Sequence, residues 1–361
     1  MSVTELFDRA SPKRVDRITI RRPDDFHVHL RDGAMLKAVL PFTAAQFARG
    51  VIMPNLVPPV TSVTDAKAYR ERILAARAAS SDFQPLMTCY LTDETSPDEI
   101  ERGFKDGVWV AAKLYPAGAT TNAHHGVTDL PALAPVLERM EKISMPVLIH
   151  GEATDPAVDI FDREAVFMEQ NLLPMLKRHA GLKVVIEHVT TAETVDIVRA
   201  HASHTAGTIT PHHLVINRTS LFQGGLRPHL YCLPVAKRER HRLALRKAVT
   251  SGDACFFIGT DTAPHRRNAK EAECCSAGVF GGATALQTYV QVFDEEGALD
   301  RFEAFASVNG AKFYGLELNR GTITLERRES PVMAAVAVED TEVVVFQGGQ
   351  TLPWSVGEVT R

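Results

Sequence analysis

The chain has 361 residues, of which 45% are hydrophobic and 23% are charged, a composition typical of a globular protein with a large core. Its formal net charge of -4 gives no general electrostatic reason to expect a nucleic-acid partner. Residues 1–17 mix acids and bases, and no apolar run approaches the roughly 20 residues that span a bilayer, so we expect neither a secretory signal nor a membrane helix. The five scattered cysteines suit a reducing cytoplasm better than a disulfide framework.

Short apolar runs rich in strand-forming residues alternate along the chain with stretches of helical character. The runs predict eight strands, over residues 18–30, 50–54, 85–91, 109–115, 146–150, 183–188, 207–210 and 254–260. The intervening stretches predict helices over 35–49, 64–79, 97–105, 130–143, 161–179, 191–200 and 235–250, with a last helical region at 283–313. Alternation of this kind indicates a parallel sheet with crossover helices.

Eight such strands predict a closed (β/α)₈ barrel, the TIM-barrel fold of the α/β class. We expect a single domain over residues 1–361, with the barrel core at about 18–315 and an accessory segment at 316–361. Residues 321–326 and 332–346 read as β-rich, and we expect them to pair with the chain before the first barrel strand as a small extra layer. No Gly-x-Gly-x-x-Gly turn follows the first strand, which argues against a doubly wound nucleotide-binding sheet.

His27 and His29 are separated by one residue near the end of the first predicted strand. Side chains alternate across a strand, so both imidazoles point to the same face. Neutral imidazole is a common ligand for zinc-like metals, and this pair could bind one ion. The alternative is a strand with two polar residues facing solvent.

Further polar residues end or follow other predicted strands. They are Asn55, Lys113, His150, His188 and Asp261. In a (β/α)₈ barrel the carboxyl ends of the strands meet on one face, so these groups converge there. The four histidines and Asp261 give five ligands, which are too many for one catalytic zinc and too few for two, since such an ion takes about three.

Lys113 would supply the missing bridge. A buried lysine that loses its proton can react with carbon dioxide to form a carbamate, which is a carboxylate mimic that spans two metals. The alternative for a lone lysine after a strand is a surface or salt-bridged side chain.

Five short motifs carry a family resemblance: His27-Val28-His29, Ala112-Lys113-Leu114-Tyr115-Pro116, His150-Gly151-Glu152, Glu187-His188 and Gly259-Thr260-Asp261. Together they resemble the binuclear amidohydrolase superfamily. Longer motifs follow: Arg22-Pro23-Asp24-Asp25-Phe26-His27-Val28-His29-Leu30-Arg31-Asp32-Gly33, Met53-Pro54-Asn55-Leu56, Arg227-Pro228-His229-Leu230-Tyr231-Cys232-Leu233-Pro234 and Asp261-Thr262-Ala263-Pro264-His265. From about residue 20 to 315 these are similar to the family of short bacterial dihydroorotases.

The resemblance implies a zinc-dependent, reversible cyclisation of N-carbamoyl-L-aspartate to L-dihydroorotate in pyrimidine (UMP) biosynthesis. It implies two zinc ions bridged by hydroxide and by N6-carboxylated Lys113. His27, His29 and Asp261 would hold the more buried ion, and His150 and His188 the other. Asp261 would also act as the general acid and base.

The resemblance also implies the substrate contacts. Arg31, Asn55 and His265 would hold the substrate carboxylate, and backbone groups of Leu233, Ala277 and Gly278 would contact the ring. Thr120 and Thr121 would form the tip of a lid loop. The expected partners are the small-molecule substrate and a second copy of the chain in a cytoplasmic homodimer, with no nucleic acid and no membrane.

Two other functions remain open at this point. A hydantoinase would share the metals but lack a dedicated carboxylate clamp, and a metal-free barrel could serve as a structural partner of another enzyme. Other conspicuous residues, which we leave outside the metal shell, are the adjacent pairs His124-His125, His212-His213 and Cys274-Cys275, together with His229.

Overall fold

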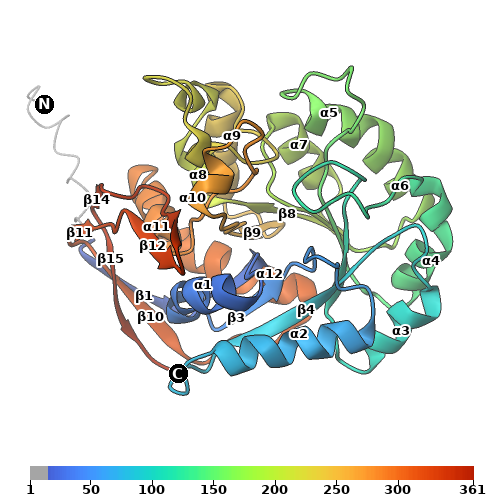
Figure 1. Ribbon diagram of the computed structural model, residues 1–361, viewed down its shortest axis with the longest axis horizontal. Coiled ribbons are helices and arrows are strands. Elements are labelled where there is room, and N and C mark those ends of the chain that lie inside the picture. Colours follow the sequence, from blue (N-terminus) through green and yellow to red (C-terminus); the bar gives the residue numbers. More distant parts are fainter. Residues whose placement is uncertain (1–14) are drawn as a thin grey trace, which may run out of the picture.

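The structure is a computed structural model that describes residues 15–361. Residues 1–14, on which most of the prediction about a secretory signal falls, lie outside this range. Within it, eight parallel strands form one sheet in the order in which they occur along the chain (Figure 1). They are β2 (Asp24–Val28), β3 (Arg49–Ile52), β4 (Gln84–Tyr90), β5 (Ala111–Leu114), β6 (Val147–Ile149), β7 (Val184–Ile186), β8 (Thr205–Ile209) and β9 (Phe256–Ile258).

The first and last strands of this sheet meet and close it. Val28 forms a parallel bridge with Thr262, just after β9. Backbone hydrogen bonds run from the amide of Asp261 to the carbonyl of His27 at 3.0 Å, and from the amide of His29 to the carbonyl of Thr262 at 3.1 Å. The predicted (β/α)₈ barrel is therefore confirmed.

Helices surround the barrel (Figure 1). They are α1 (Gly33–Gln46), α2 (Val63–Ala76), α3 (Pro97–Lys105), α4 (Ala134–Lys142), α5 (Arg163–Phe167), α6 (Leu173–Arg178), α7 (Ala192–Ala200), α8 (Pro211–Val215), α9 (Glu239–Val249), α10 (Arg267–Lys270), α11 (Ala285–Glu295) and α12 (Asn309–Tyr314). The hydroxyls of Ser62 and Thr191 cap α2 and α7 by accepting a backbone N–H of the first turn. In the described chain, no helix is both long and apolar enough to cross a membrane.

The inside of the barrel is apolar at its floor and polar above it. Ala111, Leu148 and Val185 belong to a buried cluster that also contains Phe26 and Phe257, whose ring centroids are 5.0 Å apart. Side chains two residues farther along the strands point to the same face. The inward face therefore continues to the carboxyl ends of the strands, where its residues become polar.

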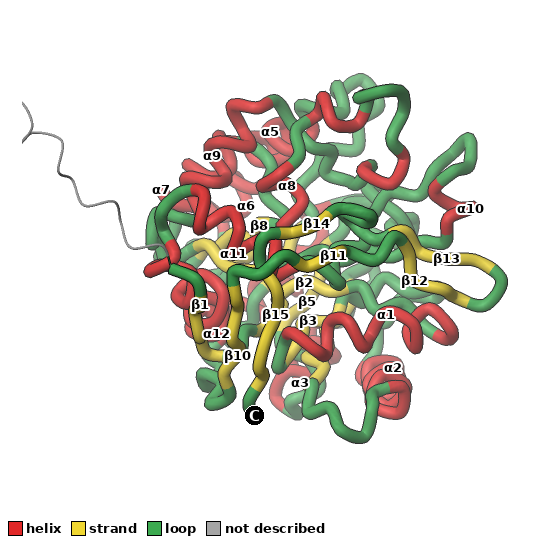
Figure 2. The backbone as a smooth tube through the Cα atoms, turned by 90° about the vertical axis from the view of Figure 1, so that its left-hand side faces the viewer, coloured by secondary structure: helices red, strands yellow, loops and turns green. Residues whose placement is uncertain are grey.

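A second, smaller layer joins the two ends of the described chain (Figure 2). β1 (Arg17–Arg21) pairs antiparallel with β10 (Thr322–Glu326), which pairs on its other edge with β15 (Ser355–Val359). Two small pairs complete the C-terminal segment: β11 (Ser330–Pro331) with β14 (Thr351–Leu352), and β12 (Ala335–Val338) with β13 (Thr341–Val344). The expected N- and C-terminal β extensions are present, and residues 322–326 pair with β1 as predicted. The same prediction for residues 332–346 was wrong, because β12 and β13 in this range pair with each other and not with β1.

The single strand predicted over 18–30 was wrong. This run forms β1 and β2, which lie in different sheets and are separated by Arg22 and Pro23. The guanidinium of Arg22 is buried at this junction, where it donates to Asp82 at 2.6 Å and to the carbonyl of Ala44 at 2.7 Å. Proline cannot donate to a sheet ladder, so the break falls where one N–H is missing.

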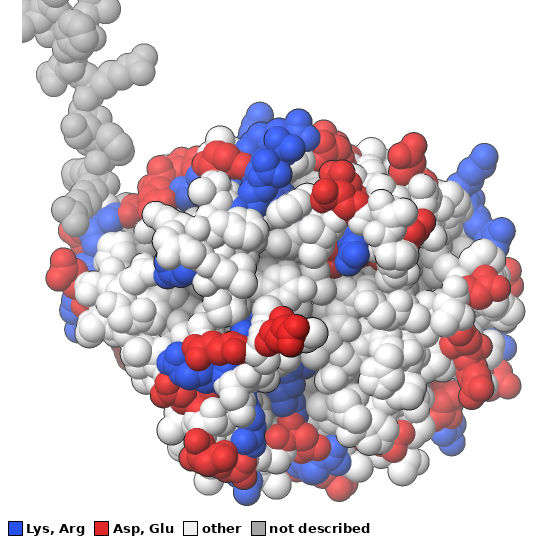
Figure 3. All heavy atoms as spheres, turned by 45° about the horizontal axis from the view of Figure 1, so that its top comes forward, with Lys and Arg blue, Asp and Glu red and all other residues white. Residues whose placement is uncertain are grey.

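The surface carries charges of both signs. Figure 3 shows acidic and basic side chains interspersed over one face of the molecule, with uncharged residues across its middle. This distribution agrees with the net charge of -4.

Candidate active site

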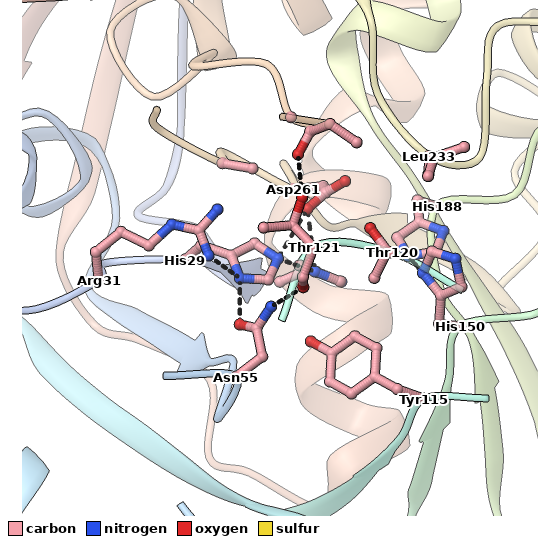
Figure 4. Close-up of a pocket in the computed structure, with 14 residues that line it drawn as sticks. His29, Arg31, Asn55, Tyr115, Thr120, Thr121, His150, His188, Leu233 and Asp261 are labelled. Atoms are coloured by element: carbon pink, nitrogen blue, oxygen red, sulfur yellow. Dashed lines mark hydrogen bonds and ion pairs between the residues drawn. The ribbon is translucent and has the colours of Figure 1, made fainter. Parts of the chain in front are cut away.

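Nearly all the predicted site residues line one pocket at the carboxyl ends of the barrel strands (Figure 4). The lining residues are His27, His29, Arg31, Asn55, Tyr115, Thr120, Thr121, His150, His188, Leu233, Asp261, Ala263, Ala277 and Gly278. Lys113 and His265 were also predicted and lie directly behind this lining. Lys113 carries an amine over the Tyr115 ring, 4.7 Å from its centroid, and a ring nitrogen of His265 lies 2.9 Å from the carbonyl oxygen of Ala277.

Three ligand-type atoms meet at one side of the pocket. Nε2 of His27 lies 3.1 Å from Nε2 of His29, and Oδ1 of Asp261 lies 3.2 Å and 3.1 Å from these two nitrogens. Ligand atoms held about 2.0–2.2 Å from one zinc ion are separated from one another by a little over 3 Å. The spacing of this trio therefore matches a shared metal ion, and the two histidines do lie on one face of β2 and its extension.

A second pair of imidazoles lies beside the trio. Nδ1 of His150 is 3.1 Å from Nε2 of His188, and the rings of His27 and His188 are 5.2 Å apart between centroids. Ligand atoms of His27, His188 and Asp261 all lie within 4.8 Å of one another. The two groups are thus contiguous and could hold two neighbouring ions.

Buried partners lie against the outward nitrogen of three of the four imidazoles. Nδ1 of His27 lies 3.0 Å from Oε1 of Glu187, and Nδ1 of His29 lies 2.8 Å from Oδ1 of Asn55. Nε2 of His150 lies 2.8 Å from Oε2 of Glu152. Partners of this kind orient a metal-ligating histidine and set its tautomer.

Lys113 is completely buried on β5, where its Nζ contacts Oε2 of Glu187. Burial holds the pKa of its amine well below the usual value, although Asp261 opposes this shift. Two residues earlier on the same strand, Ala111 belongs to the floor of the barrel. Of the two alternatives for Lys113, the surface position is therefore wrong, and the salt-bridged one agrees with its contact with Glu187.

The metal-type ligands are largely uncharged before a cation binds, except for one carboxylate. Burial lowers the pKa of His29 to about 3, and it also lowers the pKa values of His27, His150 and His188. Burial alone would raise the pKa of Asp261, but its electrostatic interactions and hydrogen bonds with His27 and His29 hold it well below its usual range. Neutral imidazoles beside an ionised carboxylate are the donors that a divalent cation requires.

Buried polar atoms at the centre of this set support the fit. Nζ of Lys113 and both carboxylate oxygens of Glu187 are inaccessible to solvent, and none of them has a hydrogen bond of acceptable geometry among the described residues. Buried polar atoms in native structures are rarely left unpaired. Coordination of a cation beside this amine accounts for such a cluster, and the donor set as a whole fits a pair of divalent ions.

Three residues of the pocket adopt backbone conformations that L-amino acids rarely use. The φ angles of Arg31, His188 and Asp261 are +58°, +42° and +45°. Such left-handed conformations cost roughly 1–3 kcal/mol each and gather at functional sites. The chain thus turns sharply where each of these side chains must face the centre.

A basic group lies beside the trio. Nη1 of Arg31 is 3.4 Å from Nδ1 of His29, and its Nη2 is 3.2 Å from Nε2 of His265. Burial and the neighbouring Arg31 charge lower the pKa of His265 to about 2. A guanidinium placed this way can bind a carboxylate through two parallel hydrogen bonds.

The loop after β5 reaches across the pocket. The hydroxyl of Thr121 donates to the carbonyl of Ala277 at 3.3 Å, and Nδ2 of Asn55 donates to the carbonyl of Thr121 at 3.2 Å. Nδ2 of Asn122 in turn donates to the carbonyl of Asn55 at 3.1 Å. Asn55 therefore links this loop to His29, a role that sequence reasoning did not foresee.

The conspicuous residues left outside the metal shell lie elsewhere. His212, His213 and Cys232 form a separate buried cluster. Nε2 of His213 is 3.0 Å from the carbonyl oxygen of Pro234, and Nδ1 is 2.8 Å from the hydroxyl of Thr210. His213 is thus hydrogen-bonded through both ring nitrogens, whereas neither ring nitrogen of His212 has a hydrogen-bond partner among the described residues.

Sequence reasoning missed three residues of the site. Glu187 and Tyr115 were quoted only as parts of motifs. Glu187 contacts both Lys113 and His27, and Tyr115 places in the pocket a buried hydroxyl that has no hydrogen-bond partner within residues 15–361. Lys270 was not singled out at all. Period-two spacing from Val185 and Lys113 could have found Glu187 and Tyr115.

Comparisons with known proteins agree with this geometry. The amidohydrolase family model matches residues 24–327. A dihydroorotase of Sphingopyxis alaskensis is 58% identical over 94% of this chain and 98% of its own length. The solved dihydroorotase of Campylobacter jejuni is similar with a TM-score of 0.87 and 33% identity over 96% of this chain and 98% of that one. A solved dihydroorotase of Saccharomyces cerevisiae in complex with 5-fluoroorotic acid is similar with a TM-score of 0.88 and 29% identity, over 95% of this chain and 99% of that one.

The chain therefore belongs to the amidohydrolase family, the class that a barrel with this histidine and aspartate set defines. Within that family, its sequence and structure place it among the dihydroorotases.

Proposed function

We propose that the chain hydrolyses L-dihydroorotate reversibly to N-carbamoyl-L-aspartate, the dihydroorotase reaction of pyrimidine biosynthesis, at a centre of two zinc ions. One observation carries the proposal: the Arg31 guanidinium opens onto the same pocket as the cluster of metal-type ligands. The substrate is a cyclic amide that carries a carboxylate, so the reaction needs both features side by side.

His27, His29 and Asp261 would hold one ion, and His150 and His188 would hold the other. When bound, such ions lower the pKa of water from 15.7 to about 7 and polarise a carbonyl, so that hydroxide can attack the ring amide near neutral pH. The neutral imidazoles and the orientation imposed by Glu187, Asn55 and Glu152 support this assignment.

Carboxylated Lys113 would bridge the two ions. Its neutral amine attacks the carbon of carbon dioxide, a nitrogen–carbon bond forms, and one proton leaves, which gives a carbamate with two oxygens. Complete burial and a depressed pKa favour the neutral amine that this step requires.

Asp261 would carry the proton. In the hydrolytic direction the attacking water loses a proton, and the ring nitrogen must gain one as the carbon–nitrogen bond breaks. Asp261 is ionised, buried and directed into the pocket beside His27 and His29. A carboxylate in this position can accept the proton and then donate it to the leaving nitrogen.

Arg31, Asn55 and His265 would bind the substrate carboxylate, backbone groups of Leu233, Ala277 and Gly278 would contact the ring, and Thr120 and Thr121 would cover it. The yeast relative binds 5-fluoroorotic acid, which is also a pyrimidine ring bearing a carboxylate. Bidentate recognition by arginine suits that group.

The test is a spectroscopic assay of the purified protein for loss of dihydroorotate, with the metal content measured on the same sample. We expect turnover of dihydroorotate and two metal ions per chain. A metal-loaded protein that ignores dihydroorotate but opens hydantoins would support a hydantoinase instead. A protein that is metal-free and inert would support the structural partner.

We also propose a homodimer that works in the cytoplasm. All five cysteines are free thiols, which suits a reducing compartment. Light scattering coupled to gel filtration measures the mass in solution, and the mass of one chain would contradict the dimer.

A further inference from the structure

Lys270, at the end of α10, is a buried cation in the loop region after β9. It is 3% exposed, and its Nζ donates to three backbone carbonyls, those of Tyr231, Ser276 and Gly278, each at 2.8 Å. A lysine ammonium carries three N–H groups, so these three acceptors use all of them.

The three carbonyls belong to two segments that are far apart in the sequence and adjacent in space. Tyr231 lies two residues before Leu233, and Ser276 and Gly278 flank Ala277; Leu233, Ala277 and Gly278 line the pocket. The amide of Gly278 also donates to the carbonyl of Tyr231 at 3.0 Å. Lys270 thus connects the two walls of the pocket from behind.

The second wall is packed tightly against the group proposed to bind the carboxylate. Gly278 has a φ of +150°, and a Cβ built on it would lie 2.7 Å from the carbonyl oxygen of Ala263 and 2.8 Å from the His265 ring. Nε2 of His265 lies 2.9 Å from the carbonyl oxygen of Ala277. A displacement of this wall would therefore move His265 and change the shape of the pocket.

Lys270 is not held in place by an opposite charge. Within residues 15–361, no acidic side chain forms an ion pair with it. Its hydrogen bonds go to neutral carbonyls, and its Nζ lies 5.6 Å from the centroid of the Tyr231 ring. A buried cation without an opposite charge is unfavourable relative to an apolar side chain of the same volume. Lys270 instead fixes the geometry of the loops, because its single Nζ atom donates to three carbonyls at once.

We infer that Lys270 is a positioning residue for substrate binding, and that its ammonium group fixes the segments 231–233 and 276–278 so that their backbone groups meet the substrate ring. This inference rests on the proposed function. It assigns to Lys270 an effect on binding, with no contact to substrate or metal.

The test compares Lys270→Met with Lys183→Met. Lys183 donates to a single carbonyl, that of Phe313 at 3.3 Å, at the opposite end of the barrel, and is a matched control. We expect Lys270→Met to raise the KM for dihydroorotate about tenfold or more, with kcat within about threefold and two metal ions retained. Lys183→Met should leave KM unchanged. An unchanged KM in Lys270→Met, or a fall in kcat together with loss of metal, overturns the inference.

Lys270→Arg separates geometry from charge. The guanidinium keeps the positive charge but cannot direct three N–H groups from one atom, so we expect KM to rise here as well. A wild-type KM in Lys270→Arg would mean that charge alone acts and would contradict the proposed geometry. If Lys270→Met does not fold, Lys270→Gln, which keeps a short donor, takes its place with the same expectation.

Hydrogen exchange distinguishes a failure of this inference from a failure of the proposed function. If the wild-type protein does not turn over dihydroorotate, the proposed function fails. The amides of 276–278 should nevertheless exchange faster in Lys270→Met than in Lys183→Met, and equal rates would overturn the positioning role.

Discussion

At the scale of single residues, the metal-type ligands are prepared by their neighbours. Glu187, Asn55 and Glu152 each occupy one nitrogen of an imidazole and leave the other facing the centre. Glu187 is shared, because its second oxygen contacts Lys113. One buried carboxylate therefore orients a ligand of the trio and also lies against the amine proposed to bridge the ions.

Replacing Lys113 by alanine should remove the bridge. We expect the Lys113→Ala variant to lose one or both metals and to lose activity by about 100-fold or more, because the five remaining ligands are too few to coordinate two ions. Metal content and dihydroorotate turnover measured on one sample check this. Lys105→Ala, which removes an exposed lysine of α3, is the control. Full activity with two bound metals in Lys113→Ala would rule out the bridge.

Replacing Glu187 by glutamine keeps the volume of the side chain, and it should weaken metal binding. The amide is a poorer acceptor for the His27 imidazole, so we expect metal affinity to fall by about 10–100-fold. Competition with a chelator measures this directly, without any assay of activity. Glu141→Gln is the control, because its carboxylate lies 3.6 Å from His179 and outside the centre. Equal metal retention in the two variants would contradict the orienting role.

At this scale, sequence reasoning succeeded where spacing alone carries the information. The one-residue gap between His27 and His29 predicted a shared face, and their Nε2 atoms lie 3.1 Å apart. Glu187 follows the period-two spacing from Val185, but His188 next to it also faces the centre, because its φ of +42° breaks the strand alternation. The periodic pattern could have identified Glu187, and it does not predict the turn at His188.

At the scale of elements, most of the barrel was predictable because strands and helices alternate with clear hydrophobic patterns. The helix predicted over 97–105 is α3 itself. The helix predicted over 161–179 contains a π-helical turn, Met168–Leu172, ahead of Pro174 in the next turn. Proline removes one helical donor and crowds the preceding turn, so a regular helix is not maintained there. Hydrophobic period alone does not show this.

The loop held by Lys270 gives a prediction about pH. Burial lowers the pKa of Lys270 to about 8. Below that pH the ammonium has three donors, and above it the neutral amine has two, so one of the three carbonyls loses its partner. We therefore expect the KM for dihydroorotate to rise as the pH increases through about 8, and this rise to be absent in Lys270→Met.

Other titratable groups near Lys270 must be separated from it in that experiment. Burial raises the pKa of Tyr231 above its usual value and that of Cys232 to about 12, so both titrate at higher pH. Cys275 also lies close enough to influence Lys270. A Cys275→Ser variant that keeps the pH dependence would support Lys270, and one that abolishes it would refute the assignment.

At the scale of the whole molecule, the metals should contribute to stability. Ligands that bind only the folded state stabilise it by mass action. We expect a chelator to lower the melting temperature by at least about 5 °C and added zinc to restore it. Differential scanning fluorimetry measures both. Lys113→Ala should respond much less, and a wild-type melting curve that ignores the chelator would contradict the proposed centre.

The convergence of the site was predictable only at this largest scale. His27 and Asp261 are separated by most of the chain, and only a closed barrel brings them to 3.2 Å. The substrate contacts, by contrast, depended on the family resemblance, because backbone groups such as those of Ala277 and Gly278 leave no trace in side-chain patterns. The role of Lys270 could not be predicted for a related reason, because its hydrogen-bond partners are backbone carbonyls, which every residue has.

The junction between the two ends of the barrel has a consequence for how the protein is made. His27 and His29 lie on the opening strand, and Asp261 follows the closing one, with their backbones hydrogen-bonded to each other. During synthesis the ribosome releases the two histidines long before the aspartate exists. Capture of the metal by this trio must then wait for the final strand to dock, so metal uptake by a nascent chain would signal that the cylinder has closed.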